Sequence, residues 1–217
     1  MERMNSQRLI KNSYIVLLLL FLVMFQPTKT SASVTVDGFS YEIVDGEARI
    51  TGYSGPGGNV VIPSDIEGIP VTTIWHSAIS RREDVTSLTI PASVVDIKDN
   101  SIHVLYNATS YIVSASNLAY KSVDGVLFSK DGTTLIAYPC NKESSNYSVP
   151  AGVTQIGNSA FFETVSLKSV NLPNGLISIG DSAFSGHSLT YINIPTEVQS
   201  IGSRAFNGCG FTRVFIP

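Results

Sequence analysis

The segment "IGSRAFNGCGFTRVFIP", from Ile201 to Pro217, repeats the pattern of "IGDSAFSGHSLTYINIP", which begins 22 positions earlier at Ile179. A third copy, "IGNSAFFETVSLKSVNLP", begins a further 23 positions back, at Ile156. Self-similarity at a fixed period of about 20 to 50 residues indicates a repeat architecture, whose units bury their apolar faces by stacking on one another. These three copies therefore decide the fold.

Each copy ends in a six-residue unit with apolar residues at its first, fourth and sixth places, as in "LTYINI" at 189–194. The earlier units keep apolar residues at the fourth and sixth places. In chain order the seven units begin at Gly57, Val85, Ala108, Ser144, Leu167, Leu189 and Phe211. Apolar residues two positions apart lie on one face of a β-strand. We predict a β-rich repeat solenoid with one short parallel strand in each turn.

The other half of each turn carries the pattern VxxIGxxAF, whose apolar residues are expected to fill the same core. The predicted core residues are Phe161, Phe184, Phe206, Ile156, Ile179 and Ile201. The three phenylalanines should form a buried column, because they recur at the repeat period. Segments such as "GDSAFS" are too short for a full helix, so a single helical or 3₁₀ turn is expected there.

The repeat resembles the BspA-like leucine-rich repeats, whose pattern is close to IPxxVxxIGxxAFxxCxxLxxV. The last copy, "IPTEVQSIGSRAFNGCGFTRVF", matches it almost fully, with Cys209 in the cysteine position and Phe211 where leucine is usual. The resemblance extends over about Gly57 to Pro217. It implies a leucine-rich-repeat solenoid in an extracellular or cell-surface protein that functions in adhesion or protein binding, with no shared catalytic residues.

Two Asp-Gly pairs between alternating apolar segments predict β-hairpins. Asp45-Gly46 predicts a hairpin in residues 34–56 that covers the first solenoid turn. Asp131-Gly132 predicts an inserted hairpin within about 114–143, where the repeat interval lengthens to 36 residues. We expect this second hairpin to project from the solenoid, which occupies residues 57–217.

The first 33 residues have the features of a cleavable signal peptide. Basic residues precede the apolar run "YIVLLLLFLVMF" at 14–25, and small residues follow at 31–33. A run of 12 is too short to span a bilayer, which takes about 20 residues. We expect a secreted or cell-surface protein with no membrane insertion after cleavage. Cys140 and Cys209 should be free thiols, because the repeat places them about three strand spacings apart.

The chain stops directly after its last predicted strand. An uncovered strand edge is a liability in an exported protein, and solenoids usually carry a terminal cap. We favour a chain that is a truncated piece of a longer protein. The alternative is that another chain docks on this C-terminal edge.

The sequence offers little support for catalysis, cofactors or nucleic-acid binding. The formal net charge is -3 and the basic residues are dispersed. Asp181, Ser182 and His187 suggest a hydrolase, but the neighbouring copies hold other residues at these positions, so a hydrolase is a remote alternative. The three histidines fall in different turns, which argues against a metal site. The glycine-rich "SGPGGN" at 54–59 precedes a strand and is expected to be a turn.

The third and fifth places of each strand unit should face outward and form an exposed inner face. Our candidate binding residues there are Tyr191, Asn193, Arg213, Phe215, Ser169 and Asn171. The expected partner is an extracellular or host protein. Alternatively, the serines and asparagines only keep the sheet soluble, and the protein is a structural stalk. Asn107 and Asn146 lie in glycosylation sequons, and a glycan on Asn146 would obstruct the inner face.

Overall fold

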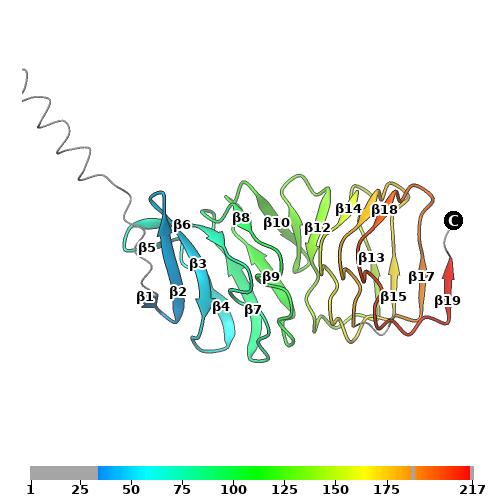
Figure 1. Cartoon of the computed structure of the whole chain (residues 1–217), viewed down its shortest axis with the longest axis horizontal. Helices are drawn as coiled ribbons and strands as arrows, with labels where there is room; N and C mark the ends of the chain where they lie inside the picture. Colours follow the sequence, from blue (N-terminus) through cyan, green and yellow to red (C-terminus); the bar gives the residue numbers. More distant parts are fainter. Residues whose placement is uncertain (1–33, 187–188, 216–217) are drawn as a thin grey trace, which may run out of the picture.

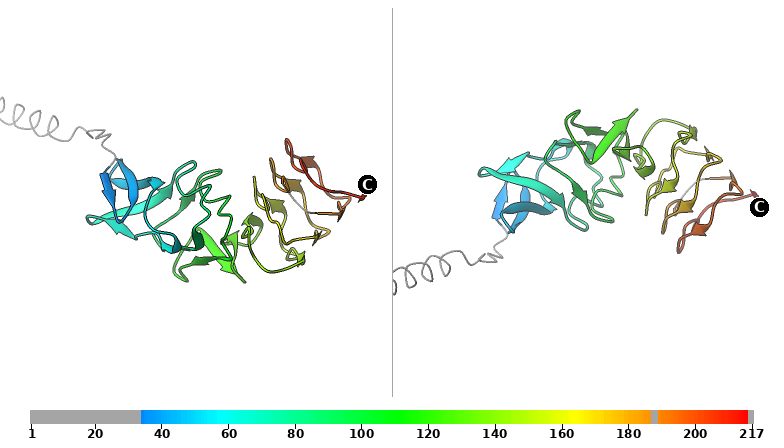
Figure 2. Two further views of the ribbon diagram at one scale, coloured as in Figure 1. Left: turned by 90° about the horizontal axis from the view of Figure 1, so that it is seen from below. Right: turned by 90° about the horizontal axis from the view of Figure 1, so that it is seen from above.

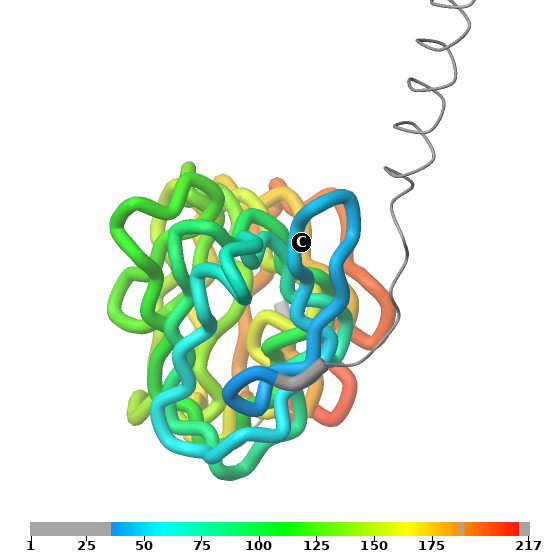
Figure 3. Tube along the Cα trace, turned by 90° about the vertical axis from the view of Figure 1, so that its left-hand side faces the viewer, coloured from blue at the N-terminus to red at the C-terminus, as the bar shows by residue number. Residues whose placement is uncertain are grey.

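The structure, a computed structural model, describes the backbone of residues 34–186 and 189–215. It describes the side chains from Val36 to Gly186 and from Leu189 to Thr212. The described residues form short β-strands and no helix. Figure 1 shows the turns stacked side by side along the long axis, and Figure 3 looks along the stack. The fold is the predicted β-rich repeat solenoid.

The inner ladder contains the seven strands that the six-residue units predict. They are β4 (Gly58–Val61), β7 (Val85–Ile90), β9 (Ser110–Val113), β13 (Asn146–Ser148), β15 (Ser169–Asn171), β17 (Tyr191–Asn193) and β19 (Arg213–Phe215). All pairings among them are parallel, in the orders β4-β7-β9 and β13-β15-β17-β19. The predicted strands are confirmed, although the ladder is divided in two.

A second ladder corrects the expectation of one strand per turn, since a second short strand forms at the VxxI segment. Its turn strands are β3 (Glu47–Tyr53), β6 (Ile69–Ile74), β8 (Asp96–Ile97), β12 (Thr134–Ala137), β14 (Gln155–Ile156), β16 (Ser178–Ile179) and β18 (Ser200–Ile201). Gly180 N–H donates to the Ile156 carbonyl at 2.8 Å, and Gly202 N–H donates to the Ile179 carbonyl at 2.8 Å. These bonds satisfy backbone groups that a loop would leave to solvent.

The AF segments form a third side of each turn, here called the turn ladder. The residue before each alanine has a left-handed backbone, with φ of 54° at Ser159, 52° at Ser182 and 54° at Arg204. Ser182 N–H donates to the Ser203 carbonyl in the next turn at 2.9 Å. The expected helical or 3₁₀ turn is therefore wrong, because left-handed residues direct these N–H groups toward the neighbouring turn.

The aromatic column is present, but its last ring, that of Phe206, is half-buried rather than buried. The rings of Phe161 and Phe184 lie 4.9 Å apart at 10°, and those of Phe184 and Phe206 lie 5.4 Å apart at 9°. Tyr138 extends the column, with its ring 5.2 Å from Phe161. Ile156 and Ile179 are buried, but Ile201 is 44% exposed and its prediction as a core residue is wrong. Ile201 lies on β18, the last described strand of the second ladder, so no further described strand covers it.

The hairpin at the start of the described chain consists of β2 (Phe39–Val44) and β3, joined by Asp45-Gly46. Both turn residues have positive φ, 54° and 82°, as expected for the mirror-image turn of a tight hairpin. β1 (Val34–Val36) adds to its outer edge, and β3 pairs in parallel with β6. The short strand β5 (Asp65–Ile66) folds back on β6. The predicted hairpin thus lies against the first turn.

The inserted segment is built into the solenoid and does not project from it. It contains β10 (Tyr120–Val123) and β11 (Val126–Ser129), and β11 pairs with β12 across the predicted Asp131-Gly132 turn. Leu127 and Phe128 are buried in the core. The expectation of a projecting hairpin is wrong, because consecutive apolar residues on β11 bury both of its faces.

The insertion divides the molecule into an N-terminal block, residues 34–113, and a C-terminal block, residues 134–215. The turn between β10 and β11 lies against β9, where the Gly125 carbonyl accepts a hydrogen bond from Tyr111 N–H at 2.8 Å. This edge of β9 therefore does not pair with β13. The buried core splits at the same place into two clusters, and Figure 2 shows the turns on either side of the inserted strands.

Candidate binding surfaces

The inner ladder of the C-terminal block presents two rows of side chains. Strand register places Ser169 beside Asn146 and Tyr191 beside Ser169, and it places Asn171 beside Ser148. The Ser169 hydroxyl donates to the Asn146 side-chain oxygen. Val170 and Ile192 alternate with these residues and are buried. The period of two thus separates an exposed polar face from the core.

Four of the six sequence-predicted binding residues have described side chains on this face, namely Ser169, Asn171, Tyr191 and Asn193. Tyr191 is 48% exposed, Asn171 and Asn193 are exposed, and Ser169 is half-buried. Arg213 pairs with Tyr191 and Phe215 pairs with Asn193 in backbone register. The side chains of Arg213 and Phe215 lie outside the described residues. Asn146, in one of the two sequons, is exposed on the same face.

The inner ladder of the N-terminal block has a different surface. Its register aligns Val61, Thr89 and Ile112 in one row across three strands. Val61 is 55% exposed and Ile112 is 46% exposed. In the adjacent row, the Ser87 hydroxyl donates to the Asn59 side-chain oxygen at 2.7 Å. This block therefore exposes apolar groups where the C-terminal block exposes amides and a tyrosine.

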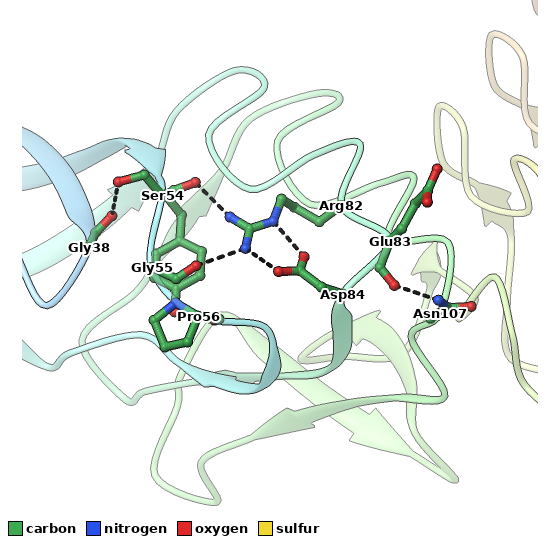
Figure 4. Close-up of polar contacts among 9 residues, drawn as sticks. Gly38, Ser54, Gly55, Pro56, Arg82, Glu83, Asp84 and Asn107 are labelled. Carbon is green, nitrogen blue, oxygen red and sulfur yellow. Dashed lines mark hydrogen bonds and ion pairs between the residues drawn. The ribbon is translucent and has the colours of Figure 1, made fainter.

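Arg82 holds the glycine-rich segment 54–59 in place (Figure 4). Its guanidinium donates to the carbonyls of Tyr53 and Gly55 at 2.9 and 2.8 Å. It also makes two bonds of 2.7 Å to the Asp84 carboxylate, and this hydrogen bonding lowers the Asp84 pKa. A Cβ on Gly57 would lie 2.3 Å from the Asp84 carbonyl oxygen, so only glycine fits there. Residues 54–57 form the predicted turn between β3 and β4, and Gly58 and Asn59 begin β4.

The side chains that suggested a hydrolase have structural roles or lie outside the described residues. The Asp181 carboxylate accepts a hydrogen bond from Ser203 N–H at 2.7 Å, as the Asn158 side chain does from Asp181 N–H at 2.8 Å. Ser182 has the left-handed backbone of the turn ladder. His187 lies outside the described residues. Equivalent positions in successive turns thus make the same link between turns.

Neither Cys140 nor Cys209 forms a disulfide within the described part of the chain. Cys140 is buried, and desolvation raises its pKa to about 11, so its thiol is neutral at physiological pH. Cys209 is half-buried and donates to the Phe184 carbonyl at 3.1 Å. Between residues 34 and 215, apart from 187 and 188, no cluster of three potential metal ligands occurs. These same residues include no helix that is long and apolar enough to cross a membrane.

The stacked parallel strands and repeat-spaced core define the chain as a leucine-rich-repeat solenoid. Residues 136–217 match the family model described as BspA type leucine rich repeat region, with six copies. The repeats within this segment are thus similar to the BspA leucine-rich type. A comparison with curated proteins gave no match.

Solved bacterial structures share the fold. A leucine-rich repeat protein from Eubacterium ventriosum is 19% identical, with a TM-score of 0.56 over 83% of this chain and 70% of that one. A leucine rich cell surface protein from Faecalibacterium prausnitzii is 22% identical, with a TM-score of 0.53 over 86% of this chain. The present chain spans 55% of the length of the second protein.

Proposed function

We propose that this protein is an exported leucine-rich-repeat module that binds another protein through the inner ladder of its C-terminal block. The observation that carries the proposal is the exposed Tyr191 among exposed amides on a sheet whose other face is packed in the core. Tyrosine offers contact area at low entropic cost and is enriched at interface hot spots. A rigid strand ladder also limits the ordering cost of association.

Export to the cell surface or the medium is part of this proposal. It is supported by the signal-peptide pattern in residues 1–33. The similar fold of a protein described as a cell surface protein also supports it. The expected partner is therefore an extracellular or host protein, and no catalytic step is invoked.

The test is capture of extracellular matrix or host-surface proteins by the wild-type protein and by the double variant Tyr191→Ala, Arg213→Ala. We expect the double variant to bind a captured partner at least about tenfold more weakly, which corresponds to 1.4 kcal/mol. Thr190→Ala, on the neighbouring exposed residue before β17, is the matched control and should bind normally. Full affinity in a folded double variant would place the site elsewhere, and a lack of any partner would favour the structural-stalk alternative.

A further inference from the structure

One turn of the solenoid is two residues shorter than the others on its turn-ladder side. Leu135 pairs in register with Ile156, and Tyr138 N–H donates to the Ala160 carbonyl as Phe161 N–H does to the Ala183 carbonyl. Leu135 and Tyr138 are thus the counterparts of Ile156 and Phe161. They are three positions apart, whereas Ile156 and Phe161 are five apart. The same spacing of five separates Ile74 from Ile79, Ile97 from Ile102, Ile179 from Phe184 and Ile201 from Phe206.

The two missing residues are counterparts of the polar pair Asn158-Ser159 in the next turn. Without them, the turns on either side of the short turn contact each other directly through side chains. Asn158 Nδ2 donates to Asp99 Oδ2 at 3.2 Å, and the Ser159 hydroxyl donates to Asn100 Oδ1 at 3.0 Å. The result is a groove of about 690 Å³, which we call the notch.

The notch has the chemistry of a site for a hydroxyl-rich ligand. Eleven of its fourteen lining residues are polar or charged, and the remaining three are Val104, Tyr106 and Phe162. Tyr106 is 38% exposed and Phe162 is half-buried. The two aromatic rings provide apolar faces, while carboxylates accept hydrogen bonds and guanidinium groups donate them.

The charges in the notch nearly cancel. Arg81 and Arg204 contribute two positive charges, and Asp99, Glu163 and Asp181 contribute three negative charges, which gives a formal sum of -1. Within the described residues, neither arginine forms an ion pair. A polyanion would meet three carboxylates, and a polycation would meet two free guanidinium groups. A neutral ligand that both donates and accepts hydrogen bonds meets neither penalty.

We propose that the notch binds a neutral oligosaccharide of about three or four sugar units, with Tyr106 packing against an apolar sugar face. The volume lies within the range of about 300 to 1,000 Å³ that is common for ligand pockets. This site lies on the turn ladder and is independent of the inner face proposed for protein binding. Dissociation constants of about 0.1 to 1 mM are expected, because each sugar hydroxyl must exchange water for protein groups.

The test is isothermal titration calorimetry of the purified protein with four neutral tetrasaccharides: cellotetraose, maltotetraose, mannotetraose and N-acetylchitotetraose. Tetragalacturonate is the anionic comparison. Tyr106→Ala should weaken binding of the active sugar at least about tenfold. Tyr191→Ala, which removes an exposed tyrosine from the inner face, is the matched control and should leave sugar binding unchanged. Glu163→Gln provides a second variant in the notch that keeps the side-chain shape, and it should also weaken binding.

Two results would overturn the proposal. One is the absence of heat with all four neutral sugars at about 5 mM, well above the expected dissociation constants. The other is binding that survives both Tyr106→Ala and Glu163→Gln, or that is tighter for tetragalacturonate than for every neutral sugar. Loss of protein capture in Tyr191→Ala with intact sugar binding would separate the two proposed surfaces.

Discussion

The two blocks of the solenoid are stabilised in different ways. In the C-terminal block, Tyr138, Phe161, Phe184 and Phe206 stack ring on ring, and backbone bonds repeat from turn to turn. In the N-terminal block the equivalent core residues are Ile79 and Ile102. The regular repeats of the C-terminal block are thus stabilised by the same ring and backbone contacts in each turn.

Individual side chains compensate where the repeat is less regular. Arg82 joins the glycine-rich segment to the second turn, and Arg49 lies 4.2 Å above the ring of Trp75. Asn117 joins the insertion to the N-terminal block, because its amide donates two hydrogen bonds to carbonyls of that block and accepts two from backbone N–H groups of the insertion. Because such contacts occur once each, a single substitution in the N-terminal block should remove a unique interaction. The following predictions test this contrast.

The largest effect is expected for Phe184→Ala in the aromatic column. Phe184 is fully buried and stacks on both sides, so its loss leaves a cavity and should lower the free energy of unfolding by about 3 to 5 kcal/mol. Denaturant unfolding followed by circular dichroism measures it. Phe206→Ala, at the half-buried end of the column, is the control and should cost less. A loss below about 1 kcal/mol for Phe184→Ala would contradict the packing.

Asn117→Ala should have the next largest effect. The Asn117 amide donates to the Pro91 and Val94 carbonyls at 2.7 and 2.8 Å and accepts bonds from Ala119 and Tyr120 N–H groups. Removing this buried side chain leaves partners unsatisfied, which should cost about 2 to 4 kcal/mol by urea unfolding. Asn174→Ala, at an exposed turn position, should cost almost nothing. Equal effects of the two substitutions would show that Asn117 does not hold the junction.

A smaller effect is expected for Arg82→Lys. Lysine keeps the charge but cannot reach two carbonyls and a carboxylate with one planar group, so we expect a loss of about 1 kcal/mol. The neighbouring Arg81 is exposed, and Arg81→Lys is a matched control that should leave the midpoint of thermal unfolding unchanged. A midpoint that is equally insensitive to Arg82→Lys would show that the fork of hydrogen bonds does not stabilise the N-terminal block.

His103 should add a modest pH dependence at the junction between the blocks. It is buried, its Nε2 lies 3.2 Å from the Ile136 carbonyl oxygen, and desolvation lowers its pKa below the ordinary 6.5. The unfolded chain then binds this proton more readily, so stability falls as the pH drops below about 6.5 and levels off below the folded pKa. His103→Phe should flatten this fall in thermal unfolding between pH 7 and 5. His76→Gln, at an exposed site, should retain it.

Much of the fold could be predicted because the relevant signals are local. Apolar residues at the fourth and sixth places of each six-residue unit predicted the inner strands. The Asp45-Gly46 pair predicted the first hairpin. The second ladder was missed because its strands at β14, β16 and β18 have two residues each, too few to show a period. The insertion was misjudged because Val126, Leu127 and Phe128 are consecutive apolar residues without alternation.

The candidate surfaces could be predicted only in part from the sequence. Alternation correctly placed Tyr191 and Asn193 outward, since their neighbour Ile192 is buried. The notch was missed because the equivalence of Tyr138 and Phe161 depends on hydrogen bonds between turns. Once that equivalence is known, the short spacing between Leu135 and Tyr138 is the sequence signal that could have revealed the groove.

The divided core also has a mechanical consequence. Within each block, a force along the stack would have to separate turns that are joined by several parallel backbone bonds at once. At the junction, the turn ladder is bridged instead by side-chain hydrogen bonds that Asn158 and Ser159 donate to Asp99 and Asn100, and among the described residues a single backbone bond from Asn141 N–H to the Ala108 carbonyl also joins the blocks. A molecule pulled from its two ends should therefore open first at this junction, and then extend in two separate steps as each block unravels.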